Sequence, residues 1–216
     1  MAQTHRLTDR GRIDRARPLA FHFNGMTVEG YEGDTLASAL IANGVHFTGR
    51  SFKYHRPRGI LTHGSDEPNA LLDVDRGNAR RDPNNRATVV EARAGLRVTT
   101  QNHWPSLERD IGAINNLLSP VFVAGFYYKT FMWPPQFWTR IYEPVIRRAA
   151  GLGTAPGTPD PDHYQHRHAH TDVLIAGAGP AGLAAALAAS ADGTARVMLA
   201  DEQDRKSTRL NSSHRH

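Results

Sequence analysis

The residues best suited to chemistry lie in one glycine-rich stretch, TDVLIAGAGPAGLAAALAAS, at residues 171–190. Gly177, Gly179 and Gly182 have the spacing of a turn that holds the pyrophosphate of a dinucleotide. Pro180 suits the first turn of the following helix, where its missing N–H costs no hydrogen bond. The stretch therefore predicts a dinucleotide site at a helix N-terminus, where free N–H groups and the helix dipole attract phosphate.

The segments on either side of the turn are those that a dinucleotide-binding fold requires. DVLIA, at residues 172–176, is a short apolar run typical of a buried parallel strand, and the alanine-rich segment after the turn predicts a helix. A second run, RVMLA at 196–200, predicts a neighbouring strand that leads into an acidic pair, where a ribose-binding carboxylate is expected. A glycine-rich turn without a nucleotide is the alternative, and the cradle itself suits NAD and FAD alike. The predicted cofactor-binding residues are Gly177, Gly179, Pro180, Ala181, Gly182, Asp201 and Glu202.

The end of the chain differs in character from the rest. DRKSTRLNSSH, at residues 204–214, has neither a helical nor a strand period. It resembles the in-frame translation of a common sequencing adapter. We expect residues 204–216 to be an artefactual, disordered tail, with a natural polar tail as the alternative. Residues 171–203 would then be a truncated βαβ unit, and the chain an N-terminal fragment.

Composition and charge exclude several classes of function. The formal net charge is +5, of which the tail contributes +3 through four cations and one anion, leaving +2 for residues 1–203. Arginines scattered over a nearly neutral body do not form the basic face that nucleic-acid binding requires. The chain has no cysteine, which excludes disulfides, thiolate metal sites and a cysteine nucleophile. A polar N-terminus and an apolar region broken by Lys129 and Pro134 predict a cytoplasmic protein without a signal peptide or membrane span.

Residues 18–103 carry the pattern of a small α+β domain. LAFHFNG, at residues 19–25, alternates apolar and polar residues, Asn24-Gly25 is a strong hairpin signal, and MTVEGYEG returns as the partner strand. Asp34 then stands as the N-cap of a predicted helix, TLASALIANG. A hairpin followed by a helix opens a β-grasp fold, the layout of plant-type ferredoxins.

Two further strands are predicted near the end of this domain. ATVVEAR at residues 87–93 and LRVTTQN at 96–102 both alternate, and Ala94-Gly95 joins them. Ferredoxins of this layout carry an iron–sulfur cluster, which requires four cysteine thiolates or a close substitute. Because the chain has no cysteine, we predict that the ferredoxin-like domain has no cluster and is structural.

Seven motifs occur along the chain in the same order as in one known family. They are GDTLASALIANG, RSFKYHRPRGIL, DEPNALL, QNHWPSLERD, AGFYYKTFMWP, YEPVIRRAAGLG and GAGPAG. Over roughly residues 10–203 the chain resembles the α (large) subunit of heterotetrameric sarcosine oxidases. The resemblance implies an oxidoreductase that demethylates sarcosine to glycine and assembles with β, γ and δ subunits. It also implies FAD in the β subunit, FMN between α and β, NAD bound by α at the glycine turn, and a tetrahydrofolate site in a region absent from this sequence.

The motifs and the resemblance together predict how the chain is organised. We expect a polar N-terminal arm (1–17), a cluster-free ferredoxin-like β-grasp domain (18–103), an aromatic arm with a Pro/His-rich linker (104–170), the start of an α/β Rossmann-type FAD/NAD(P)-binding domain (171–203) and the tail (204–216). No residue is predicted to be catalytic, because the resemblance assigns amine oxidation to a flavin of another subunit.

Three stretches allow two interpretations each. HYQHRHAH, at residues 163–170, could chelate a metal, although a solvated linker is favoured. KYHRPRG, at 53–59, could contact a phosphate or a partner, or form a solvated loop. FYYKTFMWPPQFW, at 126–138, could anchor an interface, although packing between the two domains is favoured.

Two other functions stay open. One is a cluster-bearing subunit of a related amino-acid dehydrogenase complex, against which the missing cysteines argue. The other is a non-catalytic interaction module in which the glycine turn is vestigial.

Overall fold

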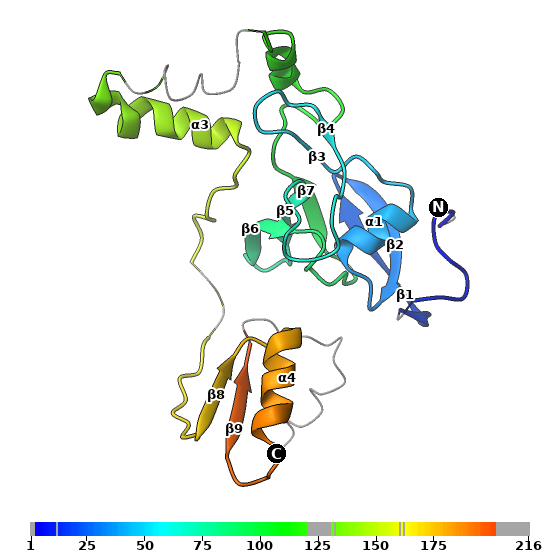
Figure 1. Cartoon of the computed structure of the whole chain (residues 1–216). Helices are drawn as coiled ribbons and strands as arrows, with labels where there is room; N and C mark the ends of the chain where they lie inside the picture. The colour runs from blue at the N-terminus through cyan, green and yellow to red at the C-terminus, as the bar shows by residue number, and fades with distance from the viewer. Residues whose placement is uncertain are drawn as a thin grey trace. The chain divides into compact units, whose positions relative to one another are not determined.

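The computed structural model describes residues 3–11, 13–120, 131, 133–159, 161 and 163–201. The chain divides into two compact units, Met1–Pro161 and Asp162–His216, and each is described by itself. The first unit holds strands β1 to β7 and the helices up to α3, and the second holds β8, α4 and β9 (Figure 1). The tail predicted at 204–216 lies outside the described residues.

The first unit is built on a five-stranded mixed sheet. Its strands are β1 (Asp14–Phe23), β2 (Met26–Glu32), β5 (Leu71–Asp75), β6 (Arg81–Arg86) and β7 (Arg97–Thr100). They lie in the order β2-β1-β7-β5-β6, with β1 and β7 parallel and every other pair antiparallel. A separate small pair joins β3 (Gly49–Arg50) to β4 (Pro57–Arg58). Helix α1 (Leu36–Ala42) lies against β2, which gives the predicted ferredoxin-like α+β fold (Figure 1).

The predicted hairpin at the start of the domain is confirmed. Asn24 and Gly25 both have positive φ, 48° and 82°, as the tight turn between two antiparallel strands requires. The turn sets a register in which Phe21 pairs with Val28, and both side chains are fully buried. The alternation read from the sequence thus directs one face of β1 into the core.

Helix α1 begins as predicted, but at a different capping residue. Thr35 is the N-cap: its side chain accepts a hydrogen bond from the Ser38 N–H at 3.1 Å, and the Ser38 hydroxyl accepts the Thr35 N–H at 3.0 Å. This reciprocal capping box satisfies two backbone donors. The prediction of Asp34 as N-cap is therefore wrong, because the carboxylate has a different set of donors.

The buried carboxylate of Asp34 fixes the N-terminal segment to the domain. Nη1 and Nη2 of Arg6 donate to it, at 3.0 and 2.7 Å, and the Tyr31 N–H donates at 2.9 Å. Arg6 also lies over the Tyr31 ring, with its Cζ 5.3 Å from the ring centroid. Bidentate pairing of this kind is among the stronger polar contacts in proteins, so Arg6 ties its segment to the start of α1.

The strand predicted at residues 87–93 is wrong. Its backbone turns and binds the N-terminus of α1 instead: the Leu36 N–H donates to the Val90 carbonyl at 2.8 Å, and the Ala37 N–H to the Ala87 carbonyl at 2.9 Å. These are two of the donors that a helix start leaves unpaired. The neighbours of β7 in the sheet are therefore β5 and β1. Strands β5 and β6 were not predicted from the sequence.

The core of the first unit lies between α1 and the sheet. Its members share almost complete burial: Phe21, Phe23, Val28, Leu36, Ala37, Ala39, Leu40, Ala70, Leu72, Val74, Ala87, Val90, Ala92, Leu96 and Val98. All belong to residues 21–98. The described residues that follow Leu107 as far as α3 contribute none.

A helical arm follows the sheet, defined here as the described residues 111–120 and 133–150. Its elements are the 3₁₀-helices η1 (Ile111–Asn116) and η2 (Pro135–Phe137), the π-helical turn η3 (Trp138–Tyr142) and the helix α3 (Glu143–Ala149). Helix α3 has its main contacts with η3 (Figure 1). Residues 126–130 and 132 of the predicted aromatic stretch lie outside the described residues.

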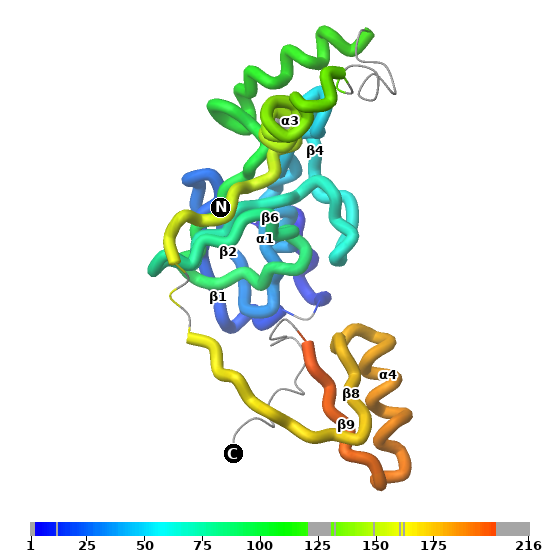
Figure 2. The backbone as a smooth tube through the Cα atoms, turned by 90° about the vertical axis from the view of Figure 1, so that its left-hand side faces the viewer, coloured from blue at the N-terminus to red at the C-terminus, as the bar shows by residue number. Residues whose placement is uncertain are grey.

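The second unit is a single βαβ motif. Strands β8 (Val173–Ala176) and β9 (Val197–Ala200) are parallel, and α4 (Pro180–Ala189) lies on one side of the pair (Figure 2). Leu174 and Met198 alternate with the half-buried strand residues and are exposed. The predicted strand–turn–helix–strand order is confirmed. Within the described residues, no helix combines the length and apolar character needed to cross a bilayer.

Candidate functional site

The first glycine of the turn reverses the chain at the end of β8. Gly177 has a φ of +100°, a conformation that side chains other than glycine's rarely tolerate. Its N–H donates to the carbonyl of Ala200 at 2.6 Å, which ties the turn to the end of β9. Because β8 and β9 are parallel, their carboxyl ends meet at this edge, where ligands bind in folds of this type.

The last glycine of the motif allows the helix to approach the strand. A Cβ atom at Gly182 would lie 1.9 Å from the carbonyl oxygen of Gly177 and 3.5 Å from Ile175 Cγ2. A backbone oxygen cannot yield as a flexible side chain can. Residue 182 must therefore be glycine if α4 is to begin where it does, as expected for the helix-packing glycine of this motif.

The middle glycine faces open space. A Cβ atom at Gly179 would meet no other atom within 4 Å, so the requirement for glycine does not come from the protein's own packing. Gly179 is the N-cap of α4 and has no side chain to satisfy the helix start. The first N–H bonded within the helix is that of Leu183, to the Gly179 carbonyl at 2.9 Å. The N–H groups of Gly179, Ala181 and Gly182 precede it and are available to an anion.

Two other predicted residues contribute in different ways. Pro180 occupies the first position of α4, where a missing N–H removes no hydrogen bond, and Ala181 places an N–H in the first turn. Helix α4 is ten residues long, which is enough for its dipole to favour a negative charge at this end. Glu202 lies outside the described residues.

Asp201 lies beside the turn at the end of β9. Its Oδ2 accepts the N–H of Ala178 at 2.5 Å, which brings the carboxylate to the middle of the glycine motif. A carboxylate here can accept a hydrogen bond from a ribose hydroxyl and repels a phosphate on that ribose. The structure thus brings Asp201 together with the three glycines, as the spacing in the sequence predicts.

These features fit the pyrophosphate of a dinucleotide. Free N–H groups lie at the start of α4, and the carboxylate of Asp201 lies at the end of the neighbouring strand. The space that a Cβ of residue 179 would occupy is open, so a phosphate can approach the backbone there. Gly179, Ala181 and Gly182 would hold the phosphates through their N–H groups, Gly177 would shape the turn, and Asp201 would bind the ribose. A bound nicotinamide or flavin would supply the redox chemistry.

The iron–sulfur cluster of a ferredoxin does not fit this chain. The sequence has no cysteine, and thiolates are the ligands that such clusters require. Within the described ranges, no three His, Asp or Glu side chains come together as a metal site would need. Residues 163–170, with their four histidines, are mainly exposed and form neither helix nor strand.

The basic stretch at 53–59 follows β3 and contains β4. Lys53 Nζ lies 5.1 Å and Arg56 Cζ 4.7 Å from the centroid of the Tyr54 ring. Arg56 Nε also donates to Asn116 Oδ1 in η1 at 2.7 Å. These contacts connect the stretch to the start of the helical arm. Contact with a phosphate or a partner stays a prediction.

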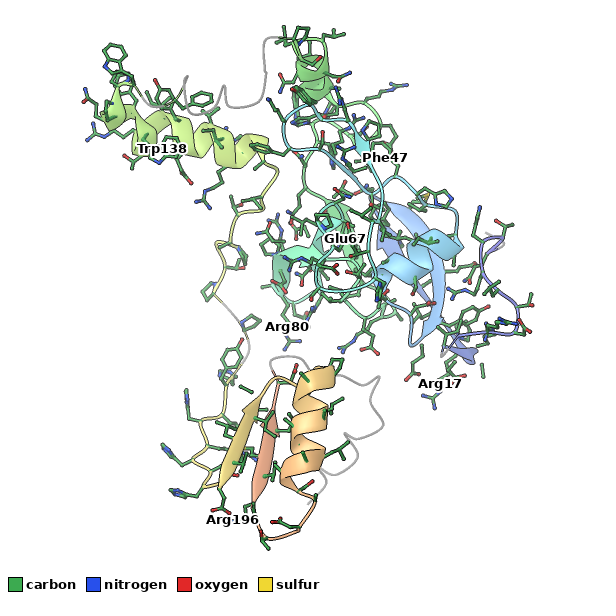
Figure 3. All side chains as sticks on the ribbon, in the orientation of Figure 1. Arg17, Phe47, Glu67, Arg80, Trp138 and Arg196 are labelled. Atoms are coloured by element: carbon green, nitrogen blue, oxygen red, sulfur yellow. The ribbon has the colours of Figure 1, made fainter. Side chains whose placement is uncertain are left out.

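Sequence reasoning missed a buried carboxylate that organises a loop. Glu67 is fully buried (Figure 3) and accepts backbone N–H groups from Leu61 (2.8 Å), Thr62 (2.7 Å), Asn69 (2.8 Å) and Ala70 (3.1 Å). Burial by itself raises the pKa of Glu67, but these four donors outweigh it and lower the pKa. Glu67 belongs to the DEPNALL motif, but a single Glu in a loop gives no pattern from which this structural role could be predicted.

A second buried carboxylate fixes the start of the helical arm. Asp110 accepts the N–H groups of Trp104 (3.0 Å) and Gly112 (3.1 Å), and His55 Nδ1 lies 2.5 Å from its other oxygen. Arg50 Nε is 3.5 Å away. Burial raises the pKa of Asp110, but the hydrogen bonds from Trp104, His55 and Gly112 lower it further than burial raises it. Only the fold shows the complete network, because His55 and Arg50 lie far from Asp110 in the sequence.

Two protein families match separate parts of the chain. A 2Fe-2S iron-sulfur cluster binding domain matches residues 16–103, and a FAD binding domain matches residues 172–214. The ranges correspond to the sheet of the first unit and to the βαβ motif of the second. The two units are therefore a ferredoxin-like domain and the start of a FAD-binding domain.

Three relatives that share one name match most of the chain. Sarcosine oxidase subunit alpha of Rhizobium meliloti (strain 1021) is 61% identical over 199 residues, covering 92% of this chain and 20% of the relative. The proteins of that name from Corynebacterium sp. strains P-1 and U-96 are 36% and 37% identical, covering 89% of this chain and 15% of each relative. Among solved structures, L-proline dehydrogenase from P. horikoshii is 19% identical with a TM-score of 0.42, covering 86% of this chain and 25% of that one.

The chain spans about a fifth or less of the length of these curated relatives. The match runs through the ferredoxin-like unit, the helical arm and the glycine turn, since it includes about nine-tenths of the chain. By sequence, this chain is a relative of the sarcosine oxidase α subunits and corresponds to their N-terminal region.

Proposed function

We propose that this chain is the N-terminal part of the α subunit of a multisubunit flavoenzyme that oxidatively demethylates sarcosine to glycine. The supporting observation is the 61% identity to a sarcosine oxidase α subunit across 92% of the chain. The reaction and the β, γ and δ partners are properties of a complete assembly, of which this chain would be one piece. A cytoplasmic location remains a prediction from the sequence.

Within that assembly, the two units have different roles. The ferredoxin-like unit is a scaffold without a cluster, in keeping with the absence of cysteine. The second unit supplies the phosphate turn of a dinucleotide site through Gly177, Gly179 and Gly182. The domain boundaries at residues 18, 104 and 171 follow from the sequence and are part of the proposal.

The dinucleotide at this turn could be FAD or NAD. The matching family is described as FAD-binding, whereas the resemblance to sarcosine oxidases implies NAD. Both cofactors place a pyrophosphate on the same helix start. FAD is therefore the first ligand to test and NAD the second, and Asp201 disfavours a phosphate on the adenosine ribose in either case.

Calorimetry on the complete α subunit tests the site. Gly179→Val places a side chain in the open cradle, where its Cβ would meet no protein atom within 4 Å, so we expect a folded protein that has lost most of its affinity for the dinucleotide. Gly157→Val is the matched control, because a Cβ there also meets nothing within 4 Å and the residue lies in the linker. Unchanged affinity in a folded Gly179→Val protein would refute the assignment.

The reaction is tested on the complete assembly. Sarcosine should be converted to glycine, and other secondary amino acids should be poorer substrates by kcat/KM. Preference for a different amino acid would favour the related dehydrogenase function. If a fully assembled complex oxidises neither sarcosine nor any other amino acid tested, the non-catalytic interaction module is favoured instead.

A further inference from the structure

The loop between β3 and β4, both labelled in Figure 1, holds an amine over an aromatic ring. The Nζ atom of Lys53 lies 5.1 Å from the centroid of the Tyr54 ring. Among the described residues Lys53 is the only lysine, and the whole sequence has no cysteine. Primary amines and thiols are the side chains that add most readily to the carbonyl group of a small aldehyde. Within the described part of the chain, Lys53 is therefore the side chain best suited to that reaction.

Hydrogen bonds across its base fix the backbone of this loop. The Ser51 N–H donates to the Arg56 carbonyl at 2.9 Å, and the His55 N–H donates to the Ser51 carbonyl at 3.0 Å. The Arg56 N–H donates to the Ser51 hydroxyl at 3.0 Å. Lys53 and Tyr54 lie between these bonds, and both residues are half-buried. The fold thus keeps the amine beside the ring, and groups held together react faster than groups that meet by diffusion.

The proposed function supplies a small aldehyde. Sarcosine differs from glycine by one CH2 unit on its nitrogen. When two hydrogens pass from the methylated amine to the flavin and water adds to the resulting C=N bond, the carbon leaves as formaldehyde. Formaldehyde adds to a primary amine and loses water, which gives a CH2=N group that is cationic when protonated.

We propose that Lys53 and Tyr54 take up formaldehyde as a methylene bridge between Nζ and the ring carbon next to the one that carries the hydroxyl. The inference rests on the proposed function for the source of its reagent. A ring attracts a cationic CH2=N group over its face, as it attracts the ammonium of Lys53. The ring electrons that form the new bond lie above and below the ring plane, so this is the approach that the reaction requires.

The modification balances without an oxidant. In the first step the amine takes up formaldehyde and a proton, the C=N bond forms, and the formaldehyde oxygen leaves as water. In the second step a ring carbon bonds to the methylene carbon, and the electrons of the C=N double bond return to nitrogen. The ring hydrogen then leaves as a proton, which replaces the one taken up. The protein gains one carbon atom in total.

Two other contacts of the same unit serve as comparisons. The Cζ atom of Arg56 lies 4.7 Å from the centroid of the Tyr54 ring, but its guanidinium is charged and delocalised, and its Nε already donates to Asn116. Tyr31 has the Cζ atom of Arg6 over its ring, 5.3 Å from the centroid. Tyr31 thus has a cation over its ring without a primary amine, and it should not react.

The test uses the assembled oxidase with the complete α subunit. Formaldehyde is added, excess glycine then reverses adducts that have formed no bridge, and the peptide with residues 51–56 is analysed by mass spectrometry. A bridge adds the mass of one carbon atom and blocks tryptic cleavage after Lys53. Tyr54→Phe keeps a ring beside the amine but lacks the hydroxyl that activates the ring. Lys53→Arg keeps the cation but lacks the primary amine.

We expect the bridge in at least about tenfold higher yield in the folded wild type than in either variant or in urea-unfolded protein. The peptide with Tyr31 should gain no carbon. Absence of the bridge from the folded wild type would overturn the proposal, and so would an equal yield from unfolded protein. A stable one-carbon product that persists in Tyr54→Phe would also overturn it, because the carbon would then lie on another partner such as Arg56.

Turnover separates this inference from the proposed function. With sarcosine in air-saturated buffer replacing the added formaldehyde, and without tetrahydrofolate to capture the carbon, the same bridge should form. If added formaldehyde gives the bridge but sarcosine gives neither the bridge nor free formaldehyde, the modification site stands and the proposed reaction is refuted. If sarcosine is converted to glycine but added formaldehyde gives no bridge, the proposed reaction stands and the modification site is refuted.

Discussion

Glu67→Gln should destabilise the ferredoxin-like unit far more than a neutralised surface carboxylate does. The side chain is fully buried, and its two oxygens each accept two backbone N–H groups, from Leu61 and Thr62 on one side and Asn69 and Ala70 on the other. Glutamine has the same shape but presents an NH2 group in place of one oxygen. Two of the four backbone donors would then face another donor.

The size of the effect follows from those two donors. A buried donor left without an acceptor costs about 1–3 kcal/mol, so two cost about 2–6 kcal/mol, and the lower cost of burying a neutral amide offsets part of this. We expect the free energy of unfolding to fall by about 2–4 kcal/mol, a large share of the roughly 5–15 kcal/mol of an ordinary domain.

The effect should depend on pH. The pKa of Glu67 is lowered in the folded protein, so its contribution is complete above the unfolded value of about 4.3 and is lost as the pH falls through the folded pKa. The difference between wild type and Glu67→Gln should therefore shrink below about pH 4.

Urea denaturation followed by circular dichroism measures the difference at about pH 7 and about pH 3. Glu32→Gln is the control, because Glu32 pairs with Arg17 at the surface, where a salt bridge contributes about 0–1 kcal/mol. A loss at neutral pH no larger than that of the control would refute the reasoning. The same loss at both pH values would show that the charge of Glu67 is not what the loop requires.

Three further predictions concern other parts of the chain. Gly182→Ala should disrupt the turn, because its Cβ would meet the Gly177 carbonyl, whereas Gly179→Ala should leave the fold intact; amide exchange of α4 distinguishes them. A double-mutant cycle with Arg6→Ala and Asp34→Asn should give a coupling energy of about 1–3 kcal/mol in urea denaturation, and additivity would contradict the bidentate pair. Anaerobic reconstitution with iron and sulfide should leave no acid-labile sulfide on the protein, and a stoichiometric amount would contradict a scaffold without a cluster.

Local signals were sufficient where local chemistry decides the structure. Asn24-Gly25 specifies its turn because both residues adopt positive φ, and the glycine motif specifies the turn after β8 because Gly177 and Gly182 have conformational and steric requirements of their own. The residues predicted to bind the cofactor, where the structure describes them, accordingly lie together at the turn after β8.

Signals that depend on distant partners were misread. Ala87, Val90 and Ala92 are buried, as the apolar residues of a strand would be, yet their backbone forms hydrogen bonds with the start of α1 and with Asp34 before it. The apolar pattern of residues 87–93 thus indicated which side chains are buried, but it did not indicate the backbone conformation. β6, with the sequence RDPNNR, has almost no apolar content and is a strand only because β5 pairs with it.

The helical arm is fixed at its start by Asp110 and at its end by Gln101, whose Nε2 donates to the carbonyl of Gly151 at 3.1 Å. These fixed ends bear on how such a protein can change. For a flexible segment closed at both ends, doubling the number of residues costs only about 0.6 kcal/mol of chain entropy. A one-residue shift at either end is different, because it would break the hydrogen bonds of Asp110 or Gln101. Insertions and deletions are therefore tolerable between the two anchors and harmful at them. The segment can acquire a new recognition surface while the sheet that carries it keeps its sequence.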